Sequence, residues 1–381
     1  MRIARWFMLI LFVTAAPLFA DSVETSVPVA VISPFMYWPT QPESGRFYRP
    51  TGVRVGSEFY LYVQGGAYKN IFTGPGGETC NAIGEKALAF KAPWTASGLR
   101  SPFTYVKMVS PCNTSVPDVH YQTGSAFISS TDGKVKLTID ETENGSDPRQ
   151  GHFKRILLGS STDGKNFTWS TFIKQSVINN VRYSISQATL VQATANTNWW
   201  GVFQWAYCTA CNGTEGIGFW NQGRIKVTMD PANPRGFVVY LLASDGVTWS
   251  PVNDDGSFTF VPYNTGRPGA RSIVNNNNTW EAWHIAGGVP TGGCDDLDPA
   301  SVSSFGYYTV SQGGSFGAFQ NVTSLTRAMP TMNGAGRLDP FRVQDMNGSR
   351  LVYSASSDRM CQEGRLNGFR GLEILVTDVN N

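Results

Sequence analysis

Charged residues are scarce in this chain. Only 15% of its 381 residues are charged, whereas soluble domains usually have roughly 25%. The 30 Lys and Arg nearly balance the 28 Asp and Glu, so there is no basic surface of the kind that binds nucleic acid. The sequence has three histidines, and it contains no paired-His metal motif and no glycine-rich phosphate loop. We therefore expect neither a nucleic-acid partner nor a cofactor.

Long apolar runs are also missing, except for a short one at the N-terminus. Arg2 and Arg5 precede the apolar run Trp6–Val13, a pattern that is typical of a secretory signal peptide. The run is shorter than the roughly 20 residues that a membrane helix needs. We expect residues 1–20 to be removed on export, 21–45 to form an N-terminal extension, and the protein to be secreted or periplasmic without a membrane span. Removal takes two basic residues and no acid, which leaves 28 of each and a formal charge of zero.

The six cysteines all follow the predicted signal peptide. An even number of cysteines in an exported protein predicts disulfides, and six allow fifteen pairings. A Cys-x-x-Cys pair could hold zinc and a group of three aspartates could hold calcium, but neither has the further ligands that such sites need. We expect no metal. The favoured pairs are Cys80–Cys112, Cys208–Cys211 and Cys294–Cys361, and the three aspartates, interpreted as a solvated turn, are Asp295, Asp296 and Asp298.

Glycine and aromatic residues, by contrast, are abundant, at 40 residues and 13%. Helical periodicity is nearly absent, and short β-branched or aromatic runs alternate with Gly, Asn, Asp and Pro, as in all-β proteins. Strand–turn–strand segments recur at intervals of roughly 60–80 residues. These segments are Arg49–Val63, Gln122–Ile139, Ser184–Trp205, Gly269–Ile285 and Leu338–Ser354.

Two closely matching turns close the repeats. Asp163-Gly164 precedes Trp169, and Asp245-Gly246 precedes Trp249. In each, Asp-Gly supplies a positive-φ hairpin turn and the aromatic ring packs back on the sheet. Five units within residues 46–381 predict one five-bladed β-propeller domain, because radial repetition leaves only short sheet edges. A pair of β-sandwiches or a β-helix is the alternative.

The entry strands and hairpins resemble the five-bladed propellers of the glycoside hydrolase type, the arabinanase and β-fructosidase superfamily. The turns are also similar to the Asp-boxes of sialidases. The resemblance implies an acid on the inner strand of each of the first three blades. This chain has Arg49-Pro50, Gly124-Ser125 and Ser186-Gln187 at the matching places. Either the catalytic acids come from other positions in the chain, or the site binds a glycan without hydrolysing it.

Acids and arginines near the strand entries are the candidates for chemistry. Glycoside hydrolysis needs two carboxyls roughly 5–5.5 Å apart for retention or roughly 6.5–9.5 Å apart for inversion. Guanidinium groups hold carboxylates in a bidentate fork, although the same arginines could instead pair with these acids and join blades. The candidate acids and bases are Asp118, Glu281 and Asp339, and the candidate substrate-binding residues are Arg49, Arg271, Arg337, His120 and His284.

Strand alternation predicts that Glu281 and His284 point to opposite faces, which disfavours them as an acid–base pair. The sequence as a whole favours a secreted, monomeric glycoside hydrolase or close relative. Its substrate would be a polysaccharide or oligosaccharide at the mouth of the propeller channel. A non-catalytic propeller that binds a glycan or protein at the cell envelope is the alternative, followed by a purely structural envelope protein.

Overall fold

The computed structural model describes most of the predicted repeats. Most described residues lie in β-strands, and α1 (Pro34–Tyr37) is the helix among them. None of the helices in the described ranges is long and apolar enough to cross a membrane. The described residues are 22–23, 30–37, 46–66, 71–95, 99, 102–115, 118–143, 152–193, 197–208, 221–266, 272–276, 279–286, 304–310, 316–322, 337–345, 348–356 and 372–380.

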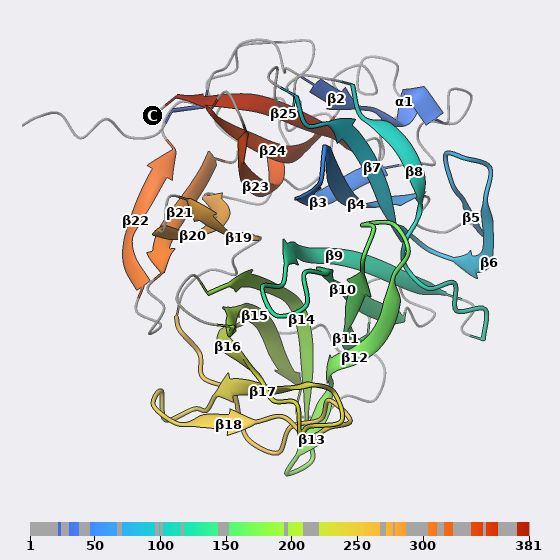
Figure 1. The fold of residues 1–381 in the computed structure, drawn as a ribbon. Helices are drawn as coiled ribbons and strands as arrows, with labels where there is room; N and C mark the ends of the chain where they lie inside the picture. The colour runs from blue at the N-terminus through green and yellow to red at the C-terminus, as the bar shows by residue number, and fades with distance from the viewer. Residues whose placement is uncertain are drawn as a thin grey trace, which may run out of the picture.

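Five antiparallel sheets, which we call blades one to five in chain order, form the fold (Figure 1). Blade one contains β3 (Arg46–Val55), β4 (Glu58–Gly66), β7 (Lys86–Pro93) and β8 (Thr104–Met108), with the hairpin β5 (Ile71–Thr73) and β6 (Thr79–Ile83) inserted before β7. Blade two contains β9 (Val119–Ile128), β10 (Val135–Glu143), β11 (His152–Ser161) and β12 (Thr168–Lys174).

Blade three is the largest described sheet. It contains β13 (Ser176–Ile178), β14 (Val181–Gln192), β15 (Trp199–Cys208), β16 (Asn221–Met229), β17 (Phe237–Leu242) and β18 (Trp249–Pro251). Blade four contains β19 (Ser272–Asn276), β20 (Thr279–Ala286), β21 (Ser304–Val310) and β22 (Phe316–Val322). Blade five contains β23 (Arg337–Asp345), β24 (Gly348–Ser356), β25 (Leu372–Asn380), β1 (Ser22–Val23) and β2 (Ala30–Ile32).

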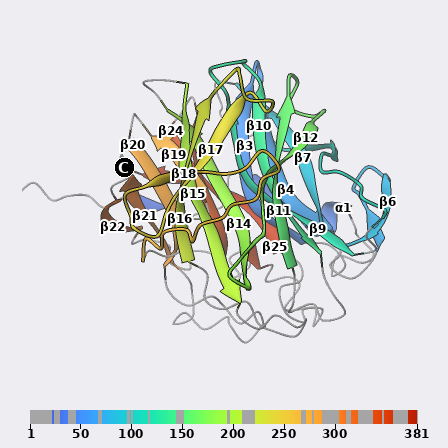
Figure 2. The same cartoon turned by 90° about the horizontal axis from the view of Figure 1, so that it is seen from below.

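The inner strands of the five blades form a closed ring. Strand β3 contacts β9, β9 contacts β14, β14 contacts β19, β19 contacts β23, and β23 returns to β3. Figures 1 and 2 show the blades arranged around this ring in two perpendicular views. The predicted five-bladed β-propeller is therefore confirmed, and each predicted strand–turn–strand segment opens one blade.

Strands from both ends of the chain meet in blade five. Val23 pairs with Val379, and Val31 pairs with Leu375, so β1 and β2 both lie along β25. The described strands of the segment expected as an N-terminal extension thus belong to the last sheet. The predicted signal peptide, residues 1–20, lies outside the described residues.

Four inner strands share an irregularity. Pairing with the second strand of the blade shifts register within β3, β9, β14 and β23. Such β-bulges bend a strand and re-aim its side chains, and they are common beside active sites. The bulges hold Arg49-Pro50, Gly124-Ser125, Gln187-Ala188 and Asp339-Pro340. The positions that the family resemblance singled out in blades one and two therefore lie in equivalent bulges. In blade three Gln187 lies in the bulge, whereas Ser186 precedes it and pairs with Gln204.

The two Asp-Gly turns have the predicted conformation. Gly164 has φ +74° and Gly246 has φ +73°. The Asp163 carboxylate accepts hydrogen bonds from the backbone N–H groups two and three residues further along the same turn, and Asp245 does the same in blade three. These side-chain bonds replace backbone pairing at the turn. The first turn joins β11 to β12 and the second joins β17 to β18, which in each case are the last two strands of the blade.

Aromatic side chains fill the spaces between blades. The ring centroids of Tyr62 and Phe167 lie 5.7 Å apart between blades one and two. Those of Phe127 and Trp199 lie 5.2 Å apart between blades two and three. Edge-to-face pairs of this kind add to the stabilisation from apolar burial. Much of the aromatic content thus serves to pack the blades against one another.

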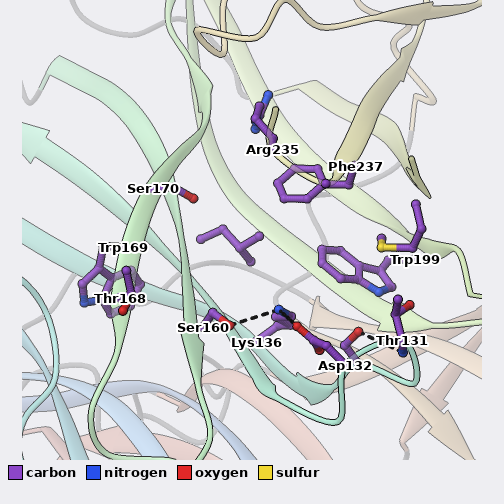
Figure 3. Close-up of a pocket in the computed structure, with 14 residues that line it drawn as sticks. Thr131, Asp132, Lys136, Ser160, Thr168, Trp169, Ser170, Trp199, Arg235 and Phe237 are labelled. Atoms are coloured by element: carbon purple, nitrogen blue, oxygen red, sulfur yellow. Dashed lines mark hydrogen bonds and ion pairs between the residues drawn. The ribbon is translucent and has the colours of Figure 1, made fainter. Parts of the chain in front are cut away.

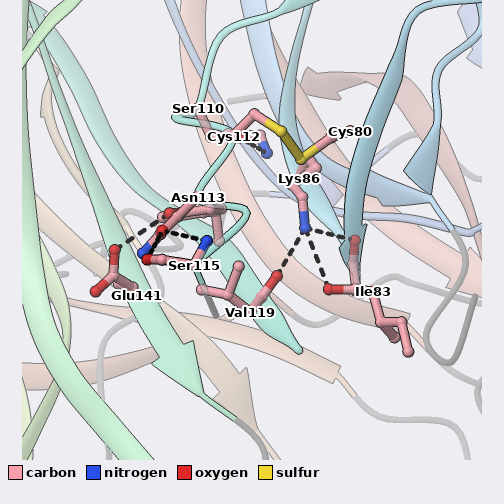
Figure 4. The surroundings of a disulfide bond; sticks show 12 residues. Cys80, Ile83, Lys86, Ser110, Cys112, Asn113, Ser115, Val119 and Glu141 are labelled. Carbon is pink, nitrogen blue, oxygen red and sulfur yellow. Dashed lines mark hydrogen bonds between the residues drawn. A yellow bond between two sulfur atoms is a disulfide. The ribbon is translucent and has the colours of Figure 1, made fainter. Parts of the chain in front are cut away.

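One disulfide joins Cys80 at strand β6 to Cys112 after β8 (Figure 4). It confirms the first of the three predicted pairs. The pairs Cys208–Cys211 and Cys294–Cys361 stay predictions, because their side chains lie outside the described residues.

Replacing Cys80 and Cys112 together by alanine should lower the free energy of unfolding by about 3–4 kcal/mol. The bond closes a segment with a sequence separation of 32, and constraint of the unfolded chain over such a loop is worth roughly that much. Urea unfolding of the double variant against the wild type measures the difference. Equal midpoints and slopes would contradict it.

Candidate functional site

Polar residues from three blades meet at the bulges. The Arg49 guanidinium donates to Gln122 Oε1 and lies 3.7 Å from Asp140 Oδ2. Asp140 Oδ2 in turn accepts from Ser186 Oγ at 2.6 Å and from the backbone N–H of Gln187 at 2.8 Å. We call these five residues the axial cluster. They connect the inner strands β3 and β14 through β9 and β10.

Arg49 is the member of the axial cluster best placed to meet a ligand. Its side chain is 15% exposed, whereas that of Asp140 is 2% exposed. Its backbone has φ +54°, a conformation that is uncommon for a residue other than glycine. The bulge therefore holds the Arg49 side chain over the buried carboxylate of Asp140.

A second polar group begins at the start of β9. The imidazole of His120 lies between two carboxylates, with Nε2 3.0 Å from Asp118 Oδ1 and Nδ1 3.0 Å from Glu85 Oε2. Tyr48 Oη donates to the same Glu85 oxygen at 2.9 Å, and Gln64 Nε2 donates to it at 2.8 Å. We call Asp118, His120, Glu85, Tyr48 and Gln64 the His120 network.

Asp118 is the carboxyl of the His120 network that reaches solvent. Its side chain is 28% exposed, whereas those of His120 and Glu85 are 3% and 1% exposed. Asp118 and Glu85 contact opposite sides of the same imidazole. Their carboxyls therefore lie within the roughly 10 Å that glycoside hydrolysis allows. Glu85, however, is buried and engaged by three donors. A carboxyl that acts together with Asp118 must therefore come from another element.

The two groups are neighbours along the same strands. Tyr48 and Arg49 are adjacent in β3, and His120 and Gln122 are two residues apart in β9. Residues two apart on a strand share a face. The axial cluster and the His120 network therefore form one continuous polar region along the inner strands of blades one to three, which we call the axial site.

Asp339 occupies the bulge of β23, next to β3 in the ring. This is the bulge position that Arg49 holds in β3. Asp339 and Asp118 thus come from the two blades that flank Arg49. The side chain of Asp339 lies outside the described part of the structure.

Glu281 is placed as a structural residue. It is 3% exposed, accepts from Trp283 Nε1 at 2.9 Å, and lies 3.2 Å from Arg342 Nη1, which is equally buried. This ion pair joins β20 of blade four to β23 of blade five. The sequence allows that arginine–acid pairs of this kind join blades, but the arginine here is Arg342, which is not among the candidate residues. We therefore leave Glu281 out of the proposed site.

The remaining predicted residues are described only in part. His284 pairs with Gly306 in blade four, and Arg337 pairs with Ala355 in blade five. Their side chains, and all of Arg271, lie outside the described residues.

Sequence reasoning missed the buried Glu85, Lys86 and Asp140. Lys86 Nζ donates to the carbonyls of Gly84 at 2.9 Å and Val119 at 2.7 Å (Figure 4), which fixes the start of β9 beside His120. Burial lowers the pKa of Lys86 from 10.5 to about 8. A Glu-Lys pair that opens an otherwise apolar strand was the available signal, since buried charges need partners.

Because burial lowers the Lys86 pKa, stability should depend on pH. Between pH 8 and about 10 the unfolded chain keeps a proton that the folded protein releases, so the free energy of unfolding rises with pH. The rise is about 1.4 kcal/mol per pH unit. We expect the free energy of unfolding of the wild type to rise by about 2 kcal/mol more than that of Lys86→Met between pH 7.5 and 9.5, as measured by denaturant unfolding. If the two proteins differ in unfolding free energy by the same amount at both pH values, the lowered pKa is contradicted.

Comparison with known proteins gives similar folds at low sequence identity. A β-xylosidase/α-arabinofuranosidase of family 43 from a compost microbial metagenome, solved with xylotriose, is 10% identical, with 95% of this chain and 98% of that chain covered and a TM-score of 0.48. The catalytic domain of a family 62 α-L-arabinofuranosidase from Coprinopsis cinerea is 11% identical, with 94% and 97% covered and a TM-score of 0.46. No protein-family profile and no curated protein sequence matches the chain. The function proposed below is argued from the residues of this chain.

Proposed function

We propose that this protein is a secreted glycoside hydrolase that binds its polysaccharide at the axial site. Asp118 and Asp339 would act as the two carboxyls, and Arg49 would hold the substrate. The observation that carries the proposal is the partly exposed Asp118 carboxylate. It contacts the buried His120 imidazole, which in turn contacts Glu85, and it belongs to the same polar region as Arg49.

The arrangement suits acid–base chemistry at Asp118. A buried imidazole lies 3.0 Å from its carboxylate oxygen, and the other ring nitrogen lies 3.0 Å from Glu85 Oε2. Positioned carboxyls that give or take a proton at the glycosidic oxygen or at water are what hydrolysis needs. Asp339 sits at the bulge of the neighbouring inner strand, so it is the best-placed partner.

Arg49 supports substrate binding. Its guanidinium has five donors, and its contacts to Gln122 and Asp140 orient it without burying it completely. Free donors at the mouth can bind sugar hydroxyls or a sugar carboxylate. His120 acts through Asp118 and is a positioning residue in this proposal.

A non-catalytic glycan-binding propeller is the second candidate. It is favoured by the positions where the resemblance implies acids, because they hold Arg49-Pro50, Gly124-Ser125 and Ser186-Gln187 at or beside the bulges of blades one to three. A binding protein needs the polar mouth but no pair of carboxyls.

Reducing-end release from arabinan, xylan, arabinoxylan and galactan separates the two candidates. We expect the wild type to release reducing ends from at least one polymer, and the double variant Asp118→Asn/Asp339→Asn to release none. Asp254→Asn, at an exposed turn, is the matched control. Binding to the polymers without release would favour the second candidate. Equal release by the double variant would refute the proposed carboxyls.

A further inference from the structure

A cavity of about 310 Å³ lies between blades two and three (Figure 3). Strands β10, β11 and β12 line it from one side, and β15 and the β16–β17 turn line it from the other. The volume falls at the lower end of the roughly 300–1,000 Å³ typical of small-molecule sites. Lys136 in its floor is four residues, or about 13 Å along β10, from Asp140 of the axial site. The cavity is therefore separate from the site described above.

Aromatic rings form the wall of the cavity on the side of blade three. Phe237 and Trp199 lie there, with ring centroids 5.8 Å apart (Figure 3). Trp169, on the opposite side, turns its indole to blade one, where Nε1 donates to the carbonyl of Val109 at 3.0 Å. The half-buried Phe237 ring can pack against the apolar C–H face of a sugar.

The floor and rim are polar but carry little net charge. Lys136 Nζ donates to Asp132 Oδ2 at 2.7 Å and to Ser160 Oγ at 3.0 Å. An ammonium group has three donors, so these two bonds leave a third for a ligand, while Asp132 balances the charge. Thr168 and Ser170 add exposed hydroxyls at the rim, and hydroxyls can both donate and accept.

The Trp199 indole adds an unused donor. Trp199 is 1% exposed, and its Nε1 has no hydrogen-bond partner among the residues that the structure describes. A buried N–H without an acceptor costs free energy, so an acceptor on a bound ligand would be stabilising. Arg235, in contrast, donates to the carbonyls of Thr171 and Phe172, and is thus already engaged.

We propose that this cavity binds one neutral sugar residue, a pentose or hexose unit of a glycan, as a second carbohydrate site. An aromatic wall, several hydroxyls and a charge-balanced Lys–Asp pair match a ligand with an apolar face and many uncharged hydroxyls. The proposal takes a glycan as ligand, as the proposed function does, but it requires no hydrolysis at the axial site.

Calorimetric titration of the full chain with xylose, arabinose, galactose, glucose and glucuronate tests the proposal. We expect saturable binding of at least one neutral sugar, weakened by about tenfold or more in Ser170→Trp and in Thr168→Trp, which both block the rim. Both positions are exposed, so the variants should fold, and thermal unfolding checks this. Trp200→Phe is the control, because the Trp200 side chain alternates to the other face of β15.

Arg49→Ala separates this inference from the proposed function. Sugar binding that persists in Arg49→Ala and is lost in Ser170→Trp assigns the ligand to the inter-blade cavity, whatever the axial site does. Absence of saturable binding by any neutral sugar would overturn the inference. Preference for glucuronate, or binding that Arg49→Ala abolishes and Ser170→Trp leaves intact, would also overturn it.

Discussion

Replacement of Asp118 or Asp339 by asparagine is expected to lower kcat on the hydrolysed polymer by about 10²–10⁴-fold for each variant. Asparagine keeps the shape of the side chain but can neither give nor take the proton, and positioned acid–base groups contribute rate factors of this size. Initial rates of reducing-end release over a range of polymer concentrations give kcat and KM separately.

The two parameters distinguish the roles within the axial site. Arg49→Ala should raise KM more than it lowers kcat, since Arg49 is assigned to binding. His120→Gln should lower kcat and change the pH profile, since His120 positions the Asp118 carboxylate at 3.0 Å. If Asp118→Asn and Asp339→Asn both keep wild-type kcat, the carboxyl assignment is wrong.

Removal of Glu281 is expected to cost about 3–5 kcal/mol of unfolding free energy. Glu281→Ala leaves the buried Arg342 guanidinium without its carboxylate and Trp283 Nε1 without its acceptor. Removal of one partner of a buried ion pair destabilises a protein by that amount. Because the pair joins blades four and five, the loss should appear as a lower midpoint in urea unfolding.

The exposed ion pair between Lys91 and Glu58 provides the matched control. Their side chains are 39% and 32% exposed, and exposed pairs contribute about 0–1 kcal/mol. Lys91→Met should therefore change stability little. The double variant Glu281→Met/Arg342→Met should recover most of the lost stability, since apolar replacement removes both charges. Equal losses in Glu281→Ala and Lys91→Met would contradict the structural role.

The fold was largely predictable because its signals are local. The Asp-Gly turns at Asp163 and Asp245, the alternating strands and the short Cys80–Cys112 spacing depend on residues near one another in sequence. The pairing of β1 and β2 with β25 could not be predicted, since it joins segments more than 300 residues apart and both strands are too short to give a periodic pattern.

The candidate site was predictable only in part. Asp118, His120 and Arg49 lie at strand entries, where a search of the inner strands finds them. Glu85 and Asp140 were missed because their partners, His120 and Ser186, are 35 and 46 residues away. Side-chain direction also depends on register, and a bulge such as that at Arg49 reverses the alternation that sequence reasoning assumes.

A crystal soaked with the oligosaccharide product of the best-hydrolysed polymer, or with the best-bound oligosaccharide if none is cut, shows directly where the sugar binds. We expect sugar density at the axial site, with a hydroxyl within hydrogen-bond distance of the Arg49 guanidinium and another at the Asp118 carboxylate. Density confined to other surfaces, with Arg49 and Asp118 free of sugar at saturating ligand, would contradict it.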